Sequence, residues 1–195
     1  MTPPWRRPVL ATLAAILMLV AATSAFARNT NETSSDLPWI EVSLSKKQLE
    51  VHLGSDVVST YGVAVGKDGH PTPTGEFNVR KIIWNPGWVP PPDAAWAKNA
   101  EAKKPGDPDN PMKMVKIFFQ EPDYYIHGTN DPDSIGEAAS HGCIRMVPKE
   151  AAEVAKYLMD HGGEPRPEPW YRRIFHSRST RVIYLDQPVT MVIHD

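Results

Sequence analysis

The sequence has 195 residues, with 23 acidic and 21 basic side chains and a formal net charge of −2 at pH 7. This mild acidity argues against a nucleic-acid partner, for which a basic surface is expected. The chain has one cysteine, Cys143, so an internal disulfide is excluded, but it is long enough to bury a core in a single domain.

Residues 1–27 have the pattern of an export signal that is not part of the fold. Two adjacent arginines supply positive charge, Val9 to Ala22 is uncharged and apolar, and Ala25-Phe26-Ala27 fits the small-x-small cleavage pattern. The apolar run is shorter than the roughly 20 residues that a membrane span needs. We therefore predict a signal peptide at 1–27 and no stable membrane span after cleavage, with a retained anchor as the alternative.

Residues 28–38 are polar and predict a flexible leader, followed by one mainly β domain at 39–195. Apolar residues alternate with polar ones at 40–44 and again at 49–53, which predicts a β-hairpin. Further strands are predicted at 61–65, 77–83, 115–119, 124–127, 182–185 and 189–193. About eight or nine strands with one main helix are typical of a small β-sandwich or open barrel.

Residues 84–112 interrupt the strand pattern with many prolines and three tryptophans. Proline at this density prevents regular strand pairing, and long loops of this kind commonly form lids or binding loops. We predict a lid or wall over a cleft, with a short helix at 94–104 because that part is rich in alanine and lysine.

The main helix is predicted to follow the cysteine. Pro148 suits a first helical turn, an apolar face continues to Leu158, and Gly162 can end the helix. Residues 164–180 are expected to be irregular. Their arginines are interpreted as a solvated face, with attraction to an anionic wall polymer as the alternative.

Cys143 is the candidate nucleophile, because a thiol whose pKa is lowered by its neighbours attacks carbonyl carbons near neutral pH. The small neighbours Ser140 and Gly142 leave room for a substrate carbonyl, and backbone N–H groups at Gly142 and Cys143 can face an oxyanion. His127 lies sixteen positions earlier at the end of a predicted strand, where it can take the thiol proton. A lone cysteine is more often a small buried hydrophobe, so the catalytic interpretation depends on this surrounding pattern.

A zinc site is the alternative for the same residues, since His127, His141 and Cys143 are acceptable ligands. No HExxH or CxxC spacing supports it, and we predict neither a metal nor another cofactor. His141 can instead brace the loop. Arg145 either holds a substrate carboxylate or lies in solvent.

Two segments together resemble the signature of the L,D-transpeptidase catalytic domain of bacterial cell-wall synthesis. They are Ile126-His127-Gly128-Thr129 and Ser140-His141-Gly142-Cys143-Ile144-Arg145-Met146. Further matches lie at Gly66-Lys67 and at residues 70–77, 108–112 and 134–136. The resemblance covers about residues 39 to 160, and ordered motifs are more specific than one short pattern.

The resemblance implies a periplasmic enzyme of cell-wall biogenesis and cell shape. Cys143 would form a thioester with a peptidoglycan stem peptide after its third residue, and the Gly128 carbonyl would orient His127. An amine of another stem would then give a 3-3 cross-link, or a lysine of an outer-membrane lipoprotein would become attached to the wall. Carbapenems would acylate Cys143. A hydrolase with the same residues, either an L,D-carboxypeptidase or a lipoprotein-releasing enzyme, and an inactive wall-binding module remain open.

Overall fold

The structure is a computed structural model that describes residues 37–92 and 94–195. The predicted signal peptide at 1–27, and the leader at 28–38 except for its last two residues, lie outside the described residues. Within the described ranges, none of the helices combines the length and the apolar character that crossing a membrane requires.

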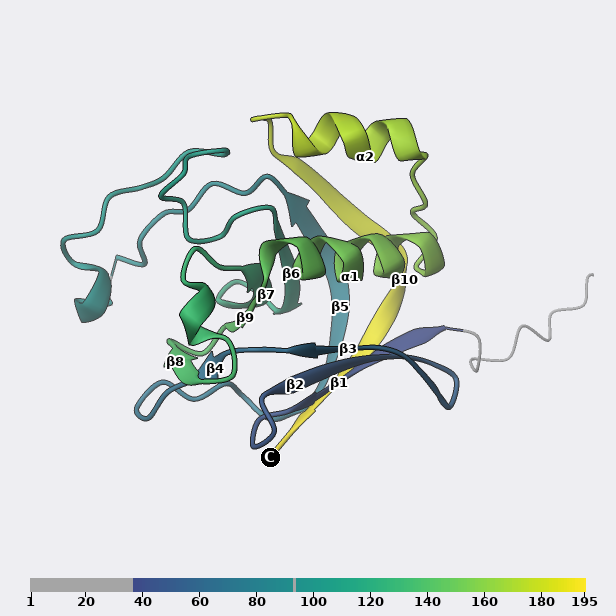
Figure 1. Ribbon diagram of the computed structural model, residues 1–195, viewed down its shortest axis with the longest axis horizontal. Helices are drawn as coiled ribbons and strands as arrows, with labels where there is room; N and C mark the ends of the chain where they lie inside the picture. The colour runs from purple at the N-terminus through teal and green to yellow at the C-terminus, as the bar shows by residue number, and fades with distance from the viewer. Residues whose placement is uncertain (1–36, 93) are drawn as a thin grey trace, which may run out of the picture. The chain divides into compact units, whose positions relative to one another are not determined.

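An eight-stranded mixed sheet is the scaffold of the domain, with the order β3-β2-β1-β10-β5-β6-β7-β9 (Figure 1). Its strands are β1 (Pro38–Ser43), β2 (Gln48–Leu53), β3 (Asp56–Gly62), β5 (Gly75–Trp84), β6 (Val115–Gln120), β7 (Tyr124–Gly128), β9 (Ile144–Met146) and β10 (Arg181–His194). The pairs β1–β10 and β7–β9 are parallel, and the other neighbours are antiparallel. Two short strands, β4 (Val65–Gly66) and β8 (Ala138–Ser140), pair in parallel beside this sheet.

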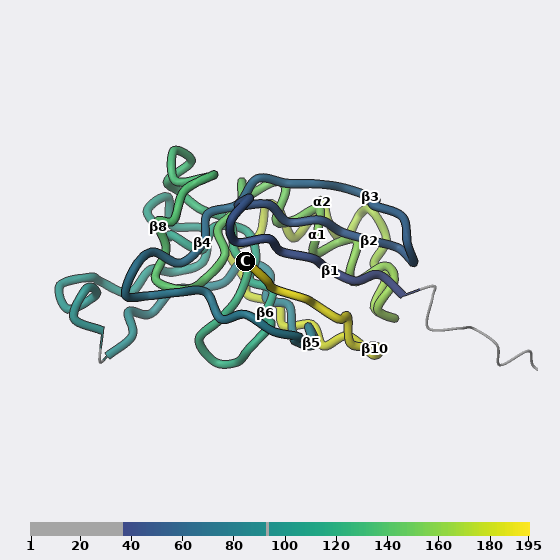
Figure 2. The backbone as a smooth tube through the Cα atoms, turned by 90° about the horizontal axis from the view of Figure 1, so that it is seen from below, coloured from purple at the N-terminus to yellow at the C-terminus, as the bar shows by residue number. Residues whose placement is uncertain are grey.

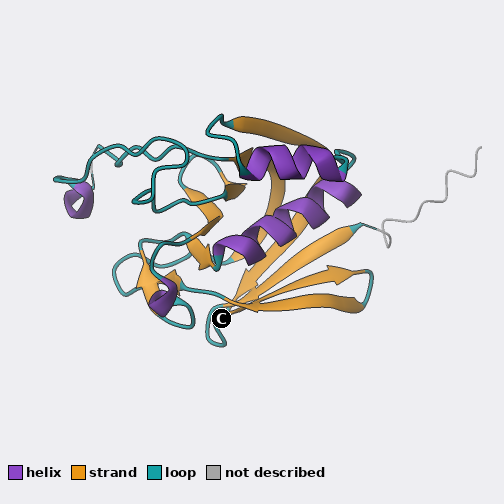
Figure 3. Cartoon of the chain, turned by 45° about the horizontal axis from the view of Figure 1, so that its top comes forward, coloured by secondary structure: helices purple, strands orange, loops and turns teal. Residues whose placement is uncertain are grey.

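Two helices, α1 (Pro148–His161) and α2 (Glu168–Phe175), cover the inner face of the curled sheet (Figure 3). α1 begins with Pro148, whose missing N–H costs nothing in a first turn, and ends where the N–H of Gly162 donates to the Leu158 oxygen at 2.7 Å. Leu158 and Met159 are fully buried in the core against the inward side chains of the strands. The two helices touch where the Lys156 ammonium lies 5.0 Å from the centre of the Tyr171 ring.

The predicted fold class is confirmed, because the chain forms a mainly β domain with its longest described helix directly after the cysteine loop. The hairpin at β1 and β2 and the helix at 148–161 lie where the sequence pattern places them. The two strands predicted at 182–185 and 189–193 form one strand, β10, with a register shift between Tyr184 and Val189. The third strand is displaced, since β3 covers 56–62 and a separate β4 follows.

Two predictions about helices are wrong. The helix expected at 94–104 is only a 3-10 turn, η1 (Ala95–Ala97), because the chain must turn back so that Trp88 and Lys103 exchange two backbone hydrogen bonds of 2.8 and 2.9 Å. The segment expected to be irregular at 164–180 contains α2. Its Pro169 lies in the first turn, where proline is tolerated, and burial of Tyr171 and Ile174 stabilises it.

Candidate active site

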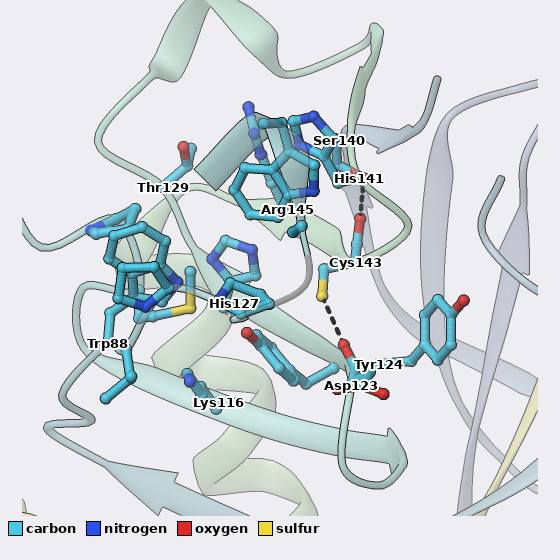
Figure 4. A pocket seen from close by; sticks show the side chains of 18 of the residues that line it. Trp88, Lys116, Asp123, Tyr124, His127, Thr129, Ser140, His141, Cys143 and Arg145 are labelled. Atoms are coloured by element: carbon cyan, nitrogen blue, oxygen red, sulfur yellow. Dashed lines mark hydrogen bonds between the residues drawn. The ribbon is translucent and has the colours of Figure 1, made fainter. Parts of the chain in front are cut away.

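A cavity of about 1270 Å³ lies where β6, β7 and the segment before β9 meet the loop at 84–112. Its lining includes His127, Thr129, Ser140, His141, Cys143 and Arg145, so the structure gathers most of the predicted site residues on one surface (Figure 4). Residues 87–92 and 94–96 of the long loop form part of the opposite wall. A space of this size exceeds the usual range of small-molecule pockets and can admit a peptide.

The loop that carries Cys143 is held by hydrogen bonds of its own. The Ser140 hydroxyl donates to the Cys143 carbonyl oxygen and accepts the N–H of Gly142 at 3.0 Å. The Gly142 N–H was predicted to face an oxyanion, but it instead donates to the Ser140 hydroxyl. Among the hydrogen bonds of the described residues, the N–H of Cys143 has no acceptor, so this group remains available for that purpose.

Gly142 is required by this loop for two reasons. Its φ of +107° lies in a region that side chains rarely adopt, and a Cβ there would lie 2.7 Å from Cε1 of Tyr124. We expect Gly142→Ala to lower the free energy of unfolding by about 1 to 3 kcal/mol more than Gly136→Ala does. Gly136 is a matched control because its φ is also positive, at +88°, but a Cβ there meets nothing within 4 Å. Thermal unfolding of both variants is the measurement, and equal losses would contradict the clash.

His127 lies on β7 directly opposite Arg145 of β9, and its side chain is buried. The distance from its Nδ1 to the Gly128 oxygen is 2.6 Å. Since a carbonyl only accepts, Nδ1 carries the hydrogen of the neutral ring and Nε2 is left as the basic nitrogen. Burial is the main reason that the pKa of His127 is lowered to about 4, and the positive charges of Arg145 and Lys116 contribute to this lowering. The backbone contacts with Gly128 and Pro111 oppose it only in part. The ring is therefore neutral at pH 7.

The sulfur of Cys143 and the ring of His127 face the same part of the cavity from neighbouring elements of the chain (Figure 4). Within the described residues the thiol donates to the Asp123 carbonyl oxygen at 3.2 Å, and no hydrogen bond joins it to His127. Burial raises the pKa of Cys143, although Tyr125, Lys116 and Arg145 each lower it. This differs from the expectation of a lowered thiol pKa, because desolvation outweighs the neighbours. The resting pair is a thiol and a neutral imidazole.

Lys116 and Tyr125 are cavity residues that sequence reasoning missed. Lys116 on β6 lies opposite His127 on β7, and its Nζ is 4.4 Å from the centre of the Tyr125 ring. Burial lowers the pKa of Lys116, while the negative charge that Cys143 can develop raises it. A lysine inside the apolar run Val115-Lys116-Ile117-Phe118-Phe119 was the available signal, since strand alternation puts it on the face shared with His127.

His141 and Arg145 contact other parts of the cavity wall. The His141 ring stacks on Trp96 with centroids 4.0 Å apart at 13°, which ties the 84–112 loop to the cysteine loop. Nη1 of Arg145 lies 3.6 Å from Oδ2 of Asp131, a largely exposed carboxylate. Among the ion pairs of the described residues, Asp131 has none with His127. Within the part of the chain that the structure describes, the donor atoms of His127, His141 and Cys143 do not gather into a metal-binding group. The geometry thus gives the zinc hypothesis for these residues no support.

Comparison with known proteins gives one family. Residues 37–183 match the L,D-transpeptidase catalytic domain, YkuD. YkuD of Bacillus subtilis, provisionally named an L,D-transpeptidase, is 39% identical over 119 residues, which are 61% of this chain and 59% of that protein. YbiS of Escherichia coli, also provisionally so named, is 31% identical over 142 residues, or 70% of this chain and 40% of that protein. The match thus spans about three fifths or less of these relatives.

Similarity to solved structures supports the fold class. The NMR structure of the catalytic domain of the E. faecium L,D-transpeptidase aligns with a TM-score of 0.50 at 16% identity. The alignment covers 83% of this chain and 99% of that domain. At this level of identity the likeness concerns the fold alone.

Proposed function

The chain belongs to the L,D-transpeptidase catalytic domain family, and from this premise we propose that it is a cysteine transpeptidase of peptidoglycan stem peptides in the periplasm. One observation carries the proposal. The single thiol of the chain lines a peptide-sized cavity that also contains a neutral, carbonyl-oriented histidine. The family as a whole acts on the cell wall, which is reached by export and is consistent with the predicted signal at 1–27.

Acylation begins with the thiol of Cys143. Its proton passes to Nε2 of His127, and the sulfur attacks the carbonyl carbon that follows the third residue of a stem peptide. The developing oxyanion accepts the N–H of Cys143, while Gly142 shapes the turn and its own N–H stays with Ser140. His127 then gives the proton to the leaving amine of the terminal D-alanine, and a thioester remains on Cys143.

Deacylation reverses these roles. An amine of a second stem peptide attacks the thioester, His127 takes its proton, and the sulfur leaves as the thiol once that proton is returned. The product is a 3-3 cross-link. A lipoprotein lysine in place of the stem amine would give wall attachment, and water would give hydrolysis. All three outcomes use the same residues.

Two cationic groups suit an anionic peptide at this site. Arg145 lines the cavity and is only weakly engaged with the exposed Asp131, so its guanidinium can attract the terminal carboxylate of the donor stem. Lys116 lowers the pKa of the thiol more than Arg145 does, so with Tyr125 it stabilises the thiolate as it forms. The 84–112 loop forms the far wall, where it can confine the stem peptide.

Lys116→Met is expected to slow alkylation of Cys143 by iodoacetamide at pH 8. The ammonium lowers the thiol pKa, and each unit by which that pKa rises cuts the thiolate fraction about tenfold. Intact-mass kinetics across a pH series measure the shift. Lys149→Met, an exposed lysine on α1, is the matched control and should leave the profile unchanged. A profile for Lys116→Met identical to that of the parent protein would exclude its role at the thiol.

The proposed function is tested by incubating the protein with tetrapeptide muropeptides, with and without an acceptor amine, and analysing products by mass spectrometry. Cross-linked dimers that need the acceptor support transfer. Tripeptide products alone would favour an L,D-carboxypeptidase. Neither product, together with retained binding to peptidoglycan, would favour the wall-binding module. A mass increase on Cys143 after carbapenem exposure tests the nucleophile independently.

A further inference from the structure

A second group of ligand-type side chains lies on the hairpin of β1 and β2. Glu41 of β1 pairs in register with Glu50 of β2, and His52 follows two residues later on the same face. The neighbours Ile40 and Val51 are buried in the core, so strand alternation puts these three side chains on the opposite face of the sheet. Figure 2 shows the backbone of β1 and β2 from below. One ligand atom from each residue lies within 4.8 Å of the other two.

His52 is the unusual member of this group. The residue is only 5% exposed, yet neither ring nitrogen has a hydrogen-bond partner among the described residues. Its ring stacks on Trp39 with centroids 3.9 Å apart at 16°, and the Trp39 indole N–H is itself fixed by the Gly54 oxygen at 2.9 Å. Nε2 of His52 lies near both carboxylates without forming a hydrogen bond to either. It lies 3.3 Å from Oε2 of Glu50 and 3.5 Å from Oε2 of Glu41.

Two interactions in this cluster are unfavourable, and one bound cation would relieve both. Like charges directly opposite each other in an antiparallel pair repel, and a buried imidazole without partners loses its hydrogen bonds with water. In a tetrahedral zinc site each nitrogen or oxygen ligand atom lies about 2.0 to 2.2 Å from the ion, so two ligand atoms lie roughly 3.3 to 3.6 Å from each other. The two separations from His52 fall in this range.

The surroundings already orient one carboxylate. Nε2 of His194 on β10 lies 2.7 Å from Oε1 of Glu41, which turns Oε2 of Glu41 toward His52. Partners of this kind behind a ligating group are typical of metal sites. One imidazole with two carboxylates suits Zn²⁺ better than Ca²⁺ or Mg²⁺, which prefer oxygen ligands alone.

We propose that Glu41, Glu50 and His52 form a zinc site that links β1 to β2, with water completing the coordination. Because it uses the face of the hairpin away from the core, the site is structural and separate from the chemistry of Cys143. The competing explanation is ionic pairing without a metal. Lys46 lines a small cavity of about 30 Å³ with both glutamates, and a protonated His52 could also bridge them.

The test is calorimetric titration of Zn²⁺ into metal-free protein at pH 7.5, carried out in a Cys143→Ala background so that the thiol cannot bind the ion. We expect one Zn²⁺ per chain, a rise in the unfolding temperature with Zn²⁺ and no comparable effect of Mg²⁺. His52→Gln and Glu50→Gln should each weaken binding at least 100-fold, and His194→Gln about 10- to 100-fold.

His176→Gln and Glu153→Gln are matched controls, because both side chains are exposed and lie on or next to the helices. They should bind Zn²⁺ like the parent. Circular dichroism identifies any variant that fails to fold, and the partly exposed Glu50 keeps the test decisive if His52→Gln does not fold. Absence of binding, or binding that survives in Glu50→Gln, would overturn the site and favour ionic pairing with Lys46 or a protonated His52. Neither zinc binding nor its absence tests the proposed transpeptidase activity.

Discussion

Cys143→Ala is expected to reduce formation of cross-linked muropeptides by at least about 1000-fold, since removal of a covalent nucleophile eliminates the acyl-enzyme route. The chain has no second cysteine to replace it. The nearby Ser140 cannot substitute, because it is 1% exposed and its hydroxyl is engaged with the Cys143 carbonyl oxygen and the Gly142 N–H. Mass spectrometry of muropeptides measures transfer, and intact mass after carbapenem exposure should show no adduct.

Thermal unfolding provides the control for Cys143→Ala. The thiol donates to the Asp123 oxygen at 3.2 Å, and a hydrogen bond from a thiol is weak, so the variant should unfold within a few degrees of the parent. Loss of activity with an intact fold then assigns the chemistry to the sulfur. If transfer persisted in the folded variant, Cys143 would not be the nucleophile. If neither protein made any product, the wall-binding hypothesis would be preferred.

The sequence could predict those features that depend on local signals. The bounds of α1 follow from Pro148 and Gly162, because these residues act on the helix that contains or adjoins them. The hairpin follows from alternation on both sides of one polar turn. The register that puts Glu41 opposite Glu50 is known only from the structure, because the alternation does not show that Gln48 already belongs to β2. Nothing in the pattern indicated that His52 would be buried.

Other features depend on distant contacts and could not be predicted in the same way. The turn at η1 replaces a helix because Lys103 pairs with Trp88, fifteen residues earlier in the chain. The thiol pKa is raised because several separate segments pack around the partly buried Cys143, whereas the sequence indicates only which charges are available. The engagement of the Gly142 N–H depends on the rotamer of Ser140. Folding thus changed the expected oxyanion donors and added Lys116 and Tyr125 to the residues that line the cavity.

His127→Gln is expected to lower transfer about 100- to 10,000-fold near neutral pH, the usual range for loss of a positioned acid–base group. In the parent, the pKa of His127 is about 4 and that of Cys143 lies above its ordinary value of 9.0. The imidazole is therefore able to accept a proton from about pH 5 upward, and kcat/KM should show no acid limb near 6.5. It should fall only as the pH approaches 4, where the ring becomes protonated.

The pH profile of the variant distinguishes a proton acceptor from a residue that only maintains the fold. Without the imidazole, solvent must remove the thiol proton, so log(kcat/KM) should rise by about one per pH unit until the thiol itself ionises. The deficit relative to the parent is then largest in acid and shrinks in alkali, whereas a misfolded site would lose activity equally at every pH. Asp131→Asn is the matched control, because among the described residues this carboxylate pairs with Arg145 and not with His127, and it should change turnover little. A constant deficit for His127→Gln, or a parent acid limb near 6.5, would contradict a buried neutral imidazole as the group that moves the proton.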